Sequence, residues 1–381
     1  MADLMDLTVH SLGAEGDGIA GLAHGGNDGA RVYVPFALPG ETVRARVTPT
    51  PDGLRGTVVE IVAASPDRIA PACPHFTVCG GCVMEHLAPK PYAAWKRGLL
   101  VDALAHAGLP DVPVGELAAV PPGTRRRATF FAHRLAQLGQ QAGAVHLGFQ
   151  ARASHDVIDL NECAALSPAL LALLPPLRDL LKRILPPGGR AEAMANLLDD
   201  GLDVVLRTPG KLQAPIRQML IEFSAARSLL RLSWQSLLGS GPVGTPETVV
   251  SRRPAVITFG KGRVAVPPGA FLQATAEGER ILVNEVLRAM DGKPKRVADL
   301  FCGAGAFSLP LVAQASVLAV DGDAALTSAL RKAADAAGIG NKLATETRDL
   351  MKRPLIADDL KKFDAVVFDP PRAGAASQAG R

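Results

Sequence analysis

Residues 296–307 read RVADLFCGAGAF, a short apolar strand that runs into a glycine-rich turn and then into a helix. Gly303 and Gly305 allow the backbone of this turn to approach a ligand closely. A G-x-G pair carries little information by itself. Here it lies at a strand end and opens a helix, which is the context that nucleotide binding requires. The stretch therefore predicts the start of a nucleotide-binding α/β domain.

The following residues continue the alternation of strands and helices. Short apolar strands are predicted at 317–323, 342–348 and 364–371, and helical segments at 273–290, 308–315 and 324–338. Strands that alternate with helices indicate a parallel sheet. We therefore expect an α/β fold from about residue 269 onwards.

Acidic residues stand at the predicted strand ends. Asp321 follows the second strand, eighteen residues after Gly303, and an acid there can accept hydrogen bonds from both ribose hydroxyls of a nucleoside. Asp349 follows the third strand and is placed to accept from an adenine amino group. The fourth strand ends at Asp369, in the run Asp-Pro-Pro-Arg that closes at Arg372.

This set of residues resembles the class I S-adenosylmethionine (SAM)-dependent methyltransferases. The D-L-F-C-G-x-G form with a later D-P-P-R is more specific than the general fold. The alternative is an NAD-binding Rossmann domain. That domain requires G-x-G-x-x-G, whereas Gly305 is followed by Ala306, Phe307 and Ser308.

The first sixty or so residues predict a small β domain. Strand-like runs with β-branched residues occupy 6–12, 31–37, 41–47 and 55–62, and glycine-rich turns at 15–30, 38–41 and 51–53 separate them. Several short strands with glycine turns are typical of the barrels that bind oligonucleotides. An arbitrary small β module fits the pattern equally well.

The middle of the chain predicts a mixture of helices and strands. A helical segment is expected near 92–107 and another at 166–185, with strands at 144–150 and 202–208. The predicted organisation is therefore a β-barrel at 1–65, a central α+β domain at 66–268 and an α/β domain at 269–381.

A basic block lies in this middle region. Between residues 121 and 155 there is no Asp or Glu, and the stretch holds Arg125, Arg126, Arg127, Arg134 and Arg152. The net charge of the whole chain is only +4. A local basic block in a near-neutral chain indicates a polyanionic partner, and a solvated charged face is the alternative.

Three of the five cysteines are clustered. Cys73, Cys79 and Cys82 are spaced C-x5-C-x2-C, and Cys163 follows far downstream. Four thiolates can hold a [4Fe–4S] cluster or a zinc ion, and the glycines at 80 and 81 would let the chain fold around a metal. Structural zinc sites favour two C-x2-C pairs, so the spacing favours iron–sulfur without excluding zinc.

These motifs together resemble the bacterial 23S rRNA uracil-5-methyltransferase family, in order and along essentially the whole chain. The resemblance rests on CPHFTVCGGC at 73–82, NEC at 161–163, DLFCGAGAF at 299–307 and DPPRAGA at 369–375. It implies a TRAM barrel, carried here by GDGIA at 16–20, a central [4Fe–4S] domain and a SAM-binding domain. The implied partner is RNA, with 23S rRNA ahead of tRNA.

The resemblance also implies roles for individual residues. The run GTRRRATF resembles the family's substrate-facing strand and assigns RNA contacts to Arg125, Arg126 and Arg127. The run PPGAFLQAT resembles an F-x-Q element. It adds Gln273 to the implied SAM contacts, which are Gln273, Phe301, Gly303, Gly305, Asp321, Asp349 and Asp369. Relatives often have a polar residue where this chain has Ala306, which removes one side-chain contact.

The chemistry of this family requires a free cysteine. Uracil C5 is a poor nucleophile, so a thiolate adds to C6 of a flipped-out uridine, C5 takes the methyl group, and a base removes the C5 proton. Four cysteines are assigned to the cluster, and Cys302 is expected as a small apolar residue beneath SAM. The family's nucleophile and base follow the D-P-P-R strand. We therefore expect both beyond Arg381, in a chain that is C-terminally truncated, with four strands where the fold needs about seven.

Two other functions are compatible with parts of the pattern. The barrel, the arginines and the cluster would survive truncation, which makes a non-catalytic RNA-binding iron–sulfur protein the main alternative. A methyltransferase acting on a base amino group needs no cysteine, but it leaves the N-terminal half unexplained.

The composition supports an intracellular protein. The N-terminus has neither a basic region nor an apolar run typical of a signal peptide, and no apolar run approaches the length of a membrane span. We expect a cytoplasmic location, no membrane contact and no obligate protein partner.

Overall fold

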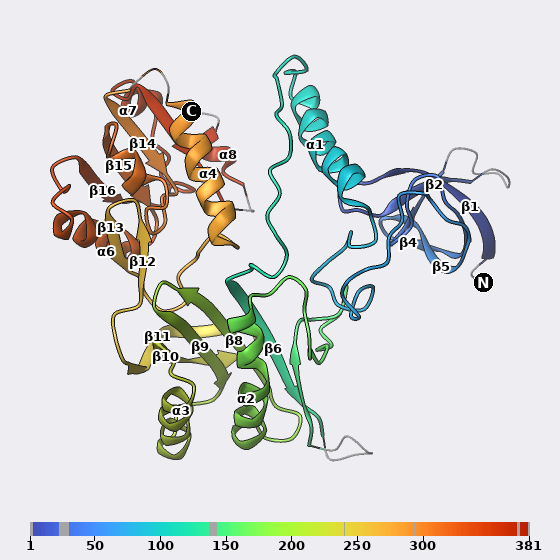
Figure 1. Ribbon diagram of the computed structural model, residues 1–381, viewed down its shortest axis with the longest axis horizontal. Coiled ribbons are helices and arrows are strands. Elements are labelled where there is room, and N and C mark those ends of the chain that lie inside the picture. Colours follow the sequence, from blue (N-terminus) through green and yellow to red (C-terminus); the bar gives the residue numbers. More distant parts are fainter. Residues whose placement is uncertain are drawn as a thin grey trace. The chain divides into compact units, whose positions relative to one another are not determined.

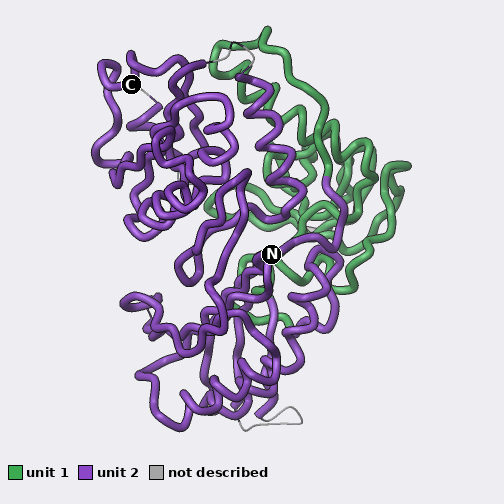
Figure 2. The backbone as a smooth tube through the Cα atoms, turned by 60° about the vertical axis from the view of Figure 1, so that its left-hand side comes forward, with its two compact units in different colours: residues 1–119, 149–158 green, residues 120–148, 159–381 purple. Residues whose placement is uncertain are grey.

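The fold is taken from a computed structural model that describes residues 3–22, 30–136, 143–239, 241–290, 292, 294–371 and 374–379. The backbone divides into two compact units, residues 1–119 with 149–158 and residues 120–148 with 159–381 (Figure 2). The predicted division into domains at 1–65, 66–268 and 269–381 stays a prediction. Arg372 of the predicted D-P-P-R run lies outside the described residues.

The first unit begins with a closed barrel (Figure 1). Its strands pair in the order β1-β2-β3-β5-β4. Alternate side chains such as Val43, Ala45 and Val47 point into the barrel and are buried. The strands are β1 (Asp3–Leu12), β2 (Gly18–Gly21), β3 (Arg31–Val34), β4 (Thr42–Thr50) and β5 (Gly53–Ala63).

Strand β2 corrects the sequence prediction, which placed residues 15–30 in a turn. Gly18 pairs with Val34, and its glycine identity reflects packing. A Cβ at Gly18 would lie 2.7 Å from the carbonyl oxygen of Ala37 and 2.8 Å from Cγ1 of Val9. The glycine is therefore required by the narrow barrel interior and not by a turn.

The first unit also contains a long helix, α1 (Pro89–His106), where a helix was predicted near 92–107. Pro89 and Pro91 lie in its first turn, where a proline costs no hydrogen bond. None of the helices formed by described residues is long and apolar enough to cross a membrane.

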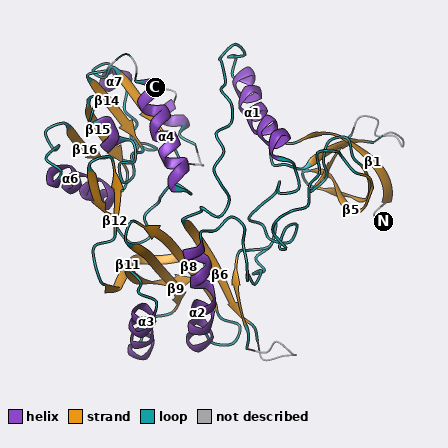
Figure 3. Ribbon diagram, in the orientation of Figure 1, coloured by secondary structure: helices purple, strands orange, loops and turns teal. Residues whose placement is uncertain are grey.

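In the second unit, the described residues form a six-stranded sheet in the order β11-β10-β9-β8-β6-β7 (Figure 3). Helices α2 (Pro168–Ile184) and α3 (Ala214–Ala226) pack against it, α2 through a stripe of buried leucines. The strands are β6 (Arg127–Arg134), β7 (Val145–Gly148), β8 (Arg190–Leu198), β9 (Gly201–Pro209), β10 (Arg231–Leu238) and β11 (Gly241–Ser251).

The chain then passes through a hairpin, β12 (Val256–Phe259) and β13 (Gly262–Ala265), into the predicted parallel α/β region. Helix α4 (Ala276–Ala289) comes first, with Thr275 as its N-cap. The remaining elements are β14 (Arg296–Leu300), α5 (Ser308–Leu311), β15 (Ser316–Asp321), α6 (Ala324–Ala336), β16 (Leu343–Thr347), α7 (Ala357–Leu360), β17 (Ala365–Phe368) and α8 (Ala376–Ala379).

Four parallel strands form the sheet of this region, in the order β16-β15-β14-β17. Both faces are covered, because Val297 belongs to one apolar core and its neighbour Ala298 to another. Strands buried on both faces are typical of parallel sheets. The predicted α/β alternation is confirmed here.

The two glycines of β2 offer a test of the barrel. Gly18→Ala should lower the free energy of unfolding by about 1–3 kcal/mol, because the new methyl group overlaps Ala37 and Val9. Gly21→Ala is the matched control, since a Cβ there meets nothing within 4 Å. Urea unfolding of both variants measures the effect, and equal midpoints would contradict the packing argument.

Candidate functional site

The carboxyl ends of the four parallel strands lie at one edge. Leu300 of β14 lies beside Val320 and Phe368, and Asp321 lies beside Thr347. The chain leaves β14 for β15 on one side, and β17 returns on the other. Such a switch point is where open α/β sheets bind ligands. The structure thus brings the residues after these strands to one place, as their positions in the sequence predicted.

The turn after β14 adopts left-handed backbone conformations. The φ angles are 61° at Phe301, 54° at Gly303 and 92° at Gly305. A Cβ at Gly303 would meet nothing within 4 Å, whereas one at Gly305 would lie 2.5 Å from Cδ1 of Leu330 in α6. Gly303 therefore borders open space that a ligand can enter, and Gly305 allows α6 to pack against the turn.

Asp321 is held in position by backbone amides. The amide of Gly303 donates to its Oδ2 at 2.8 Å, and the amide of Asp323 donates to its Oδ1 at 2.8 Å. Each carboxylate oxygen keeps a second lone pair for a further donor. A carboxylate fixed in this way beside a glycine turn suits the two hydroxyls of a ribose.

Gln273 and Asp369 meet on the other side of β14. Nε2 of Gln273 donates to Oδ2 of Asp369 at 3.4 Å. The backbone of Gln273 is also tied down, because its carbonyl oxygen accepts from Nε of Arg126 at 3.2 Å. The structure therefore places the predicted Gln273 at the predicted strand end.

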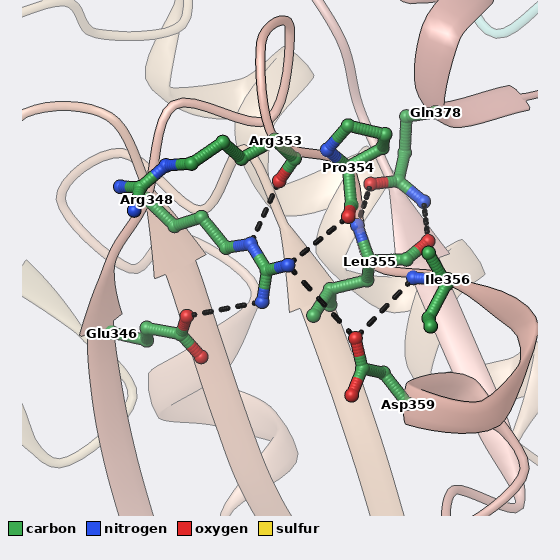
Figure 4. Close-up of polar contacts among 8 residues, drawn as sticks. All are labelled: Glu346, Arg348, Arg353, Pro354, Leu355, Ile356, Asp359 and Gln378. Carbon is green, nitrogen blue, oxygen red and sulfur yellow. Dashed lines mark hydrogen bonds and ion pairs between the residues drawn. The ribbon is translucent and has the colours of Figure 1, made fainter.

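The loop after β16 is braced by Arg348 (Figure 4). The same loop carries Asp349. Nε of Arg348 donates to the carbonyl oxygen of Arg353 at 2.7 Å, and Nη2 donates to that of Pro354 at 3.1 Å. Oδ1 of Asp349 accepts from the amides of Met351 and Lys352 at 3.1 and 3.2 Å. This edge of the site is thus shaped by a closed network of hydrogen bonds.

Helix α8 supports the same loop (Figure 4). The side chain of Gln378 accepts from the amide of Leu355 at 2.8 Å and donates to the carbonyl oxygen of Leu355 at 3.0 Å. Gln378 is buried, so both hydrogen bonds are shielded from water. Residues 348–356 are therefore held from two directions.

Asp299, which the sequence analysis did not single out, lies beneath the site. It is fully buried, its Oδ2 accepts from the hydroxyl of Ser308, and its Oδ1 has no hydrogen-bond partner among the described residues. Burial, together with the charges of Asp369 and Asp321, raises its pKa from 3.8 to about 7, although Ser308 opposes the shift. Its position one residue before the end of β14 was the available signal.

Cys302 lies in the same turn and is buried. Burial raises the pKa of its thiol well above 9.0, and the nearby carboxyl groups of Asp299 and Asp321 raise it further. A thiol in this environment stays protonated at neutral pH and is a poor nucleophile. The structure thus places Cys302 in the apolar core, as expected from the sequence.

The arginines of the basic block differ in exposure and in partners. Arg125 is exposed and Arg127 half-buried, but Arg126 is buried and its Nη2 donates to Oε2 of Glu279 at 2.6 Å. Arg134 donates to the carbonyl oxygen of Leu185. Arg152 forms an ion pair with Asp17. Side chains that are adjacent in sequence point in opposite directions, so the count of arginines overstated the exposed positive charge.

The predicted cluster ligands lie on turn-rich segments. Cys73, Cys79 and Cys82 are in the first unit, Cys163 is in the second, and all four are partly buried. The amide of Gly81 donates to Sγ of Cys79 at 3.4 Å, a contact that suits a thiolate. Among the described residues, no three His, Cys, Asp or Glu side chains gather as a metal site. Because the four positions belong to different units, the predicted ligand set stays a prediction.

Asp299 predicts a pH dependence of stability. Between pH 3.8 and about 7 the folded state keeps the proton of Asp299 and the unfolded state loses it, so the free energy of unfolding falls as the pH rises. Asp299→Asn should remove this fall, which is on the order of 4 kcal/mol across the interval. Urea unfolding at several pH values measures it.

Asp364→Asn is the control for this experiment. The amides of Arg296 and Lys295 lower the pKa of Asp364, so this carboxyl group titrates below the interval. Its replacement should leave the slope between pH 4 and 7 unchanged. Equal slopes for wild type and Asp299→Asn would contradict the argument.

Comparisons with known proteins agree with this fold. No family model matches the chain. In the solved structures, a Pyrococcus abyssi tRNA (uracil-54, C5)-methyltransferase in complex with S-adenosyl-L-homocysteine matches with a TM-score of 0.70. The match covers 97% of this chain and 84% of that chain at 17% identity. At this identity the match shows a shared fold.

Curated relatives are closer in sequence. An RNA methyltransferase of Brucella suis is 41% identical over 98% of this chain and 83% of its own length. A 23S rRNA (uracil(1939)-C(5))-methyltransferase of Bordetella bronchiseptica is 34% identical over 98% of this chain and 79% of its own length. The chain therefore belongs to the RNA methyltransferase family that includes the 23S rRNA uracil-C5 methyltransferases.

Proposed function

We propose that this protein transfers the methyl group of SAM to C5 of a uridine in RNA, with 23S rRNA as the substrate. The observation that carries the proposal is the open glycine turn beside the fixed carboxylate of Asp321, at the switch point of the sheet. The 23S rRNA relative of Bordetella bronchiseptica supports the choice of uridine C5. We also propose a cytoplasmic location, because the proposed substrate is ribosomal RNA.

The residues at the carboxyl edge fit a nucleoside. In this proposal Asp321 accepts from the ribose hydroxyls, and Asp349 accepts from the adenine amino group. The open space at Gly303 admits the ligand past the backbone. Bound SAM supplies the methyl group as an electrophile. Gln273 and Asp369 lie across β14 from Asp321, and in this proposal they bind the end of SAM that carries the methyl group.

The rest of the turn completes the proposed SAM contacts. Phe301 packs edge-on against Phe368, with ring centroids 5.7 Å apart, so both rings line the strand ends of β14 and β17. Gly305 contributes by letting α6 approach, which positions the helix that follows Asp321. These contacts shape the site and leave its polar chemistry to the carboxylates.

Methylation of uracil C5 needs a thiolate and a base. The thiolate adds to C6, and C5 then attacks the methyl group of SAM, which releases S-adenosylhomocysteine. The base removes the C5 proton, and the thiolate is eliminated from C6. We assign none of these steps to Cys302, because its thiol is buried and its pKa is raised. The other four cysteines are assigned to a cluster, so the proposal names no nucleophile among the five.

We also propose that Cys73, Cys79, Cys82 and Cys163 hold a [4Fe–4S] cluster. The donor set is four thiolates, and Gly80 allows a close turn after Cys79, since a Cβ there would lie 3.0 Å from the carbonyl oxygen of Gln150. The proposed reaction moves no net electrons, so we propose a structural role for this cluster.

RNA binding is assigned to the barrel and to the arginines that reach the surface. Arg125 is exposed, and Arg127 lies at the start of β6. We give Arg126 a positioning role instead, because its guanidinium is occupied by Glu279 and by the carbonyl oxygen of Gln273.

The target can be tested in the cell. Deleting the gene should remove one 5-methyluridine from 23S rRNA, detected by mass spectrometry of RNase fragments, and the wild-type gene should restore it. The Cys302→Ala gene should restore it too, because Cys302 is not the nucleophile. Unchanged 23S rRNA would contradict the proposal and favour a non-catalytic RNA-binding protein. Loss of 5-methyluridine from tRNA instead would identify tRNA as the substrate.

The cluster can be tested on purified protein. After anaerobic purification, the wild type should contain iron and acid-labile sulfide in equal amounts, with broad visible absorbance that Cys79→Ser abolishes. Cys302→Ala is the matched control and should retain the full iron content. Zinc in place of iron, or an iron content in Cys79→Ser equal to that in Cys302→Ala, would contradict the assignment.

A further inference from the structure

One large aromatic side chain stands exposed beside the site. Phe271 lies on the loop between β13 and α4, and 60% of its surface is exposed, whereas its neighbours Ala270 and Leu272 are 7% and 2% exposed. Phe271 is therefore not an apolar residue that the loop buries in the core, as Ala270 and Leu272 are. Neither the proposed SAM contacts nor the core uses this ring.

The loop that presents Phe271 is firmly held. Nδ2 of Asn196 donates to the carbonyl oxygen of Ala270 at 2.8 Å, and Nε of Arg126 donates to that of Gln273 at 3.2 Å. A Cβ at Gly269 would lie 3.4 Å from Cγ2 of Val205, so the loop packs directly on β9. The backbone is thus held in place on both sides of Phe271, which fixes the position of the ring.

A guanidinium covers the ring. The Cζ atom of Arg127 lies 4.1 Å from the centroid of Phe271, which is the geometry of a cation–π stack. Nε of Arg125 donates to the carbonyl oxygen of Arg127 at 3.0 Å, which brings a second cation to the same strand end. An exposed aromatic ring with two arginines beside it has the chemistry of a nucleic-acid contact.

The ring also lies next to the reacting end of the proposed site. Phe271 is two residues before Gln273, whose side chain meets Asp369 at the end of β17. A base stacked on Phe271 would therefore lie within one nucleotide step of a uridine that enters this edge. Base flipping leaves neighbouring bases unstacked, and an aromatic surface beside the pocket can compensate for that loss.

We propose that Phe271 and Arg127 form a stacking platform for an unpaired base of the RNA substrate, adjacent to the target uridine. The proposal rests on the proposed function in one respect, that the substrate is RNA. Arg127 covers one face of the ring, and the base stacks on the surface that remains exposed. The exposed Arg125 neutralises a phosphate of the same nucleotide.

The test measures RNA binding, with a 23S rRNA fragment that carries the target uridine as the probe. Phe271→Ala should weaken binding about 5- to 150-fold, which corresponds to the ~1–3 kcal/mol of a base–aromatic stack. Phe271→Trp should bind as tightly as the wild type. Leu238→Ala, at a side chain that is 53% exposed in β10, is the matched control and should leave binding unchanged.

Two further measurements separate stacking from a general loss of structure. S-adenosylhomocysteine should bind equally to wild type and Phe271→Ala. Fragments with 5-iodouridine at successive positions should crosslink to Phe271 from a position next to the target and not from distant ones. A crosslink confined to such a position supports the platform.

The outcomes distinguish this inference from the proposed function. If the wild type binds the fragment and Phe271→Ala binds it equally well, or if Phe271→Trp loses binding as fully as Phe271→Ala, the platform is wrong and the methyltransferase proposal stands. If the wild type does not bind the fragment at all, the proposed substrate is wrong and the platform falls with it.

Discussion

A buried ion pair joins the six-stranded sheet of the second unit to helix α4 of the α/β region. Arg126 precedes β6 of the six-stranded sheet, and Glu279 lies in α4 of the α/β region, with Nη2 and Oε2 2.6 Å apart. Burial raises the pKa of Glu279 above its usual value, while Arg126 opposes the shift. Removing one partner of such a pair leaves an uncompensated buried charge, a loss of about 3–5 kcal/mol.

The site depends on this pair because the same guanidinium also holds Gln273. Its Nε donates to the carbonyl oxygen of Gln273, and the side chain of Gln273 reaches Asp369. The strand that carries the surface arginines and the strand end that carries Asp369 are thus fixed to each other through three residues. In the proposed function, RNA bound at the arginines and SAM bound at the strand ends would therefore keep a constant separation.

The sequence predicted the parts of this arrangement that follow from periodicity. Strand–turn–helix order placed Phe301, Asp321, Asp349 and Asp369 at one edge, because parallel strands align their carboxyl ends. It did not identify Asp299, whose importance comes from complete burial and a missing partner. Nor did it separate Arg126 from its neighbours, since only tertiary structure shows that Glu279 lies opposite. The strand at Gly18–Gly21 was missed because glycine suits a turn and a crowded barrel equally well.

The G-x-G pair of the turn combines two unrelated demands. Gly305 is required by its neighbour Leu330, whereas Gly303 borders empty space and is constrained mainly by its left-handed backbone. Selection for folding alone would preserve Gly305 strictly and let Gly303 drift towards the residues that tolerate that backbone. Selection for ligand binding is needed to keep both. In a lineage that lost its ligand, Gly303 would therefore be replaced while Gly305 is retained. The residue at position 303 in a related sequence would then indicate whether that sequence still binds the ligand.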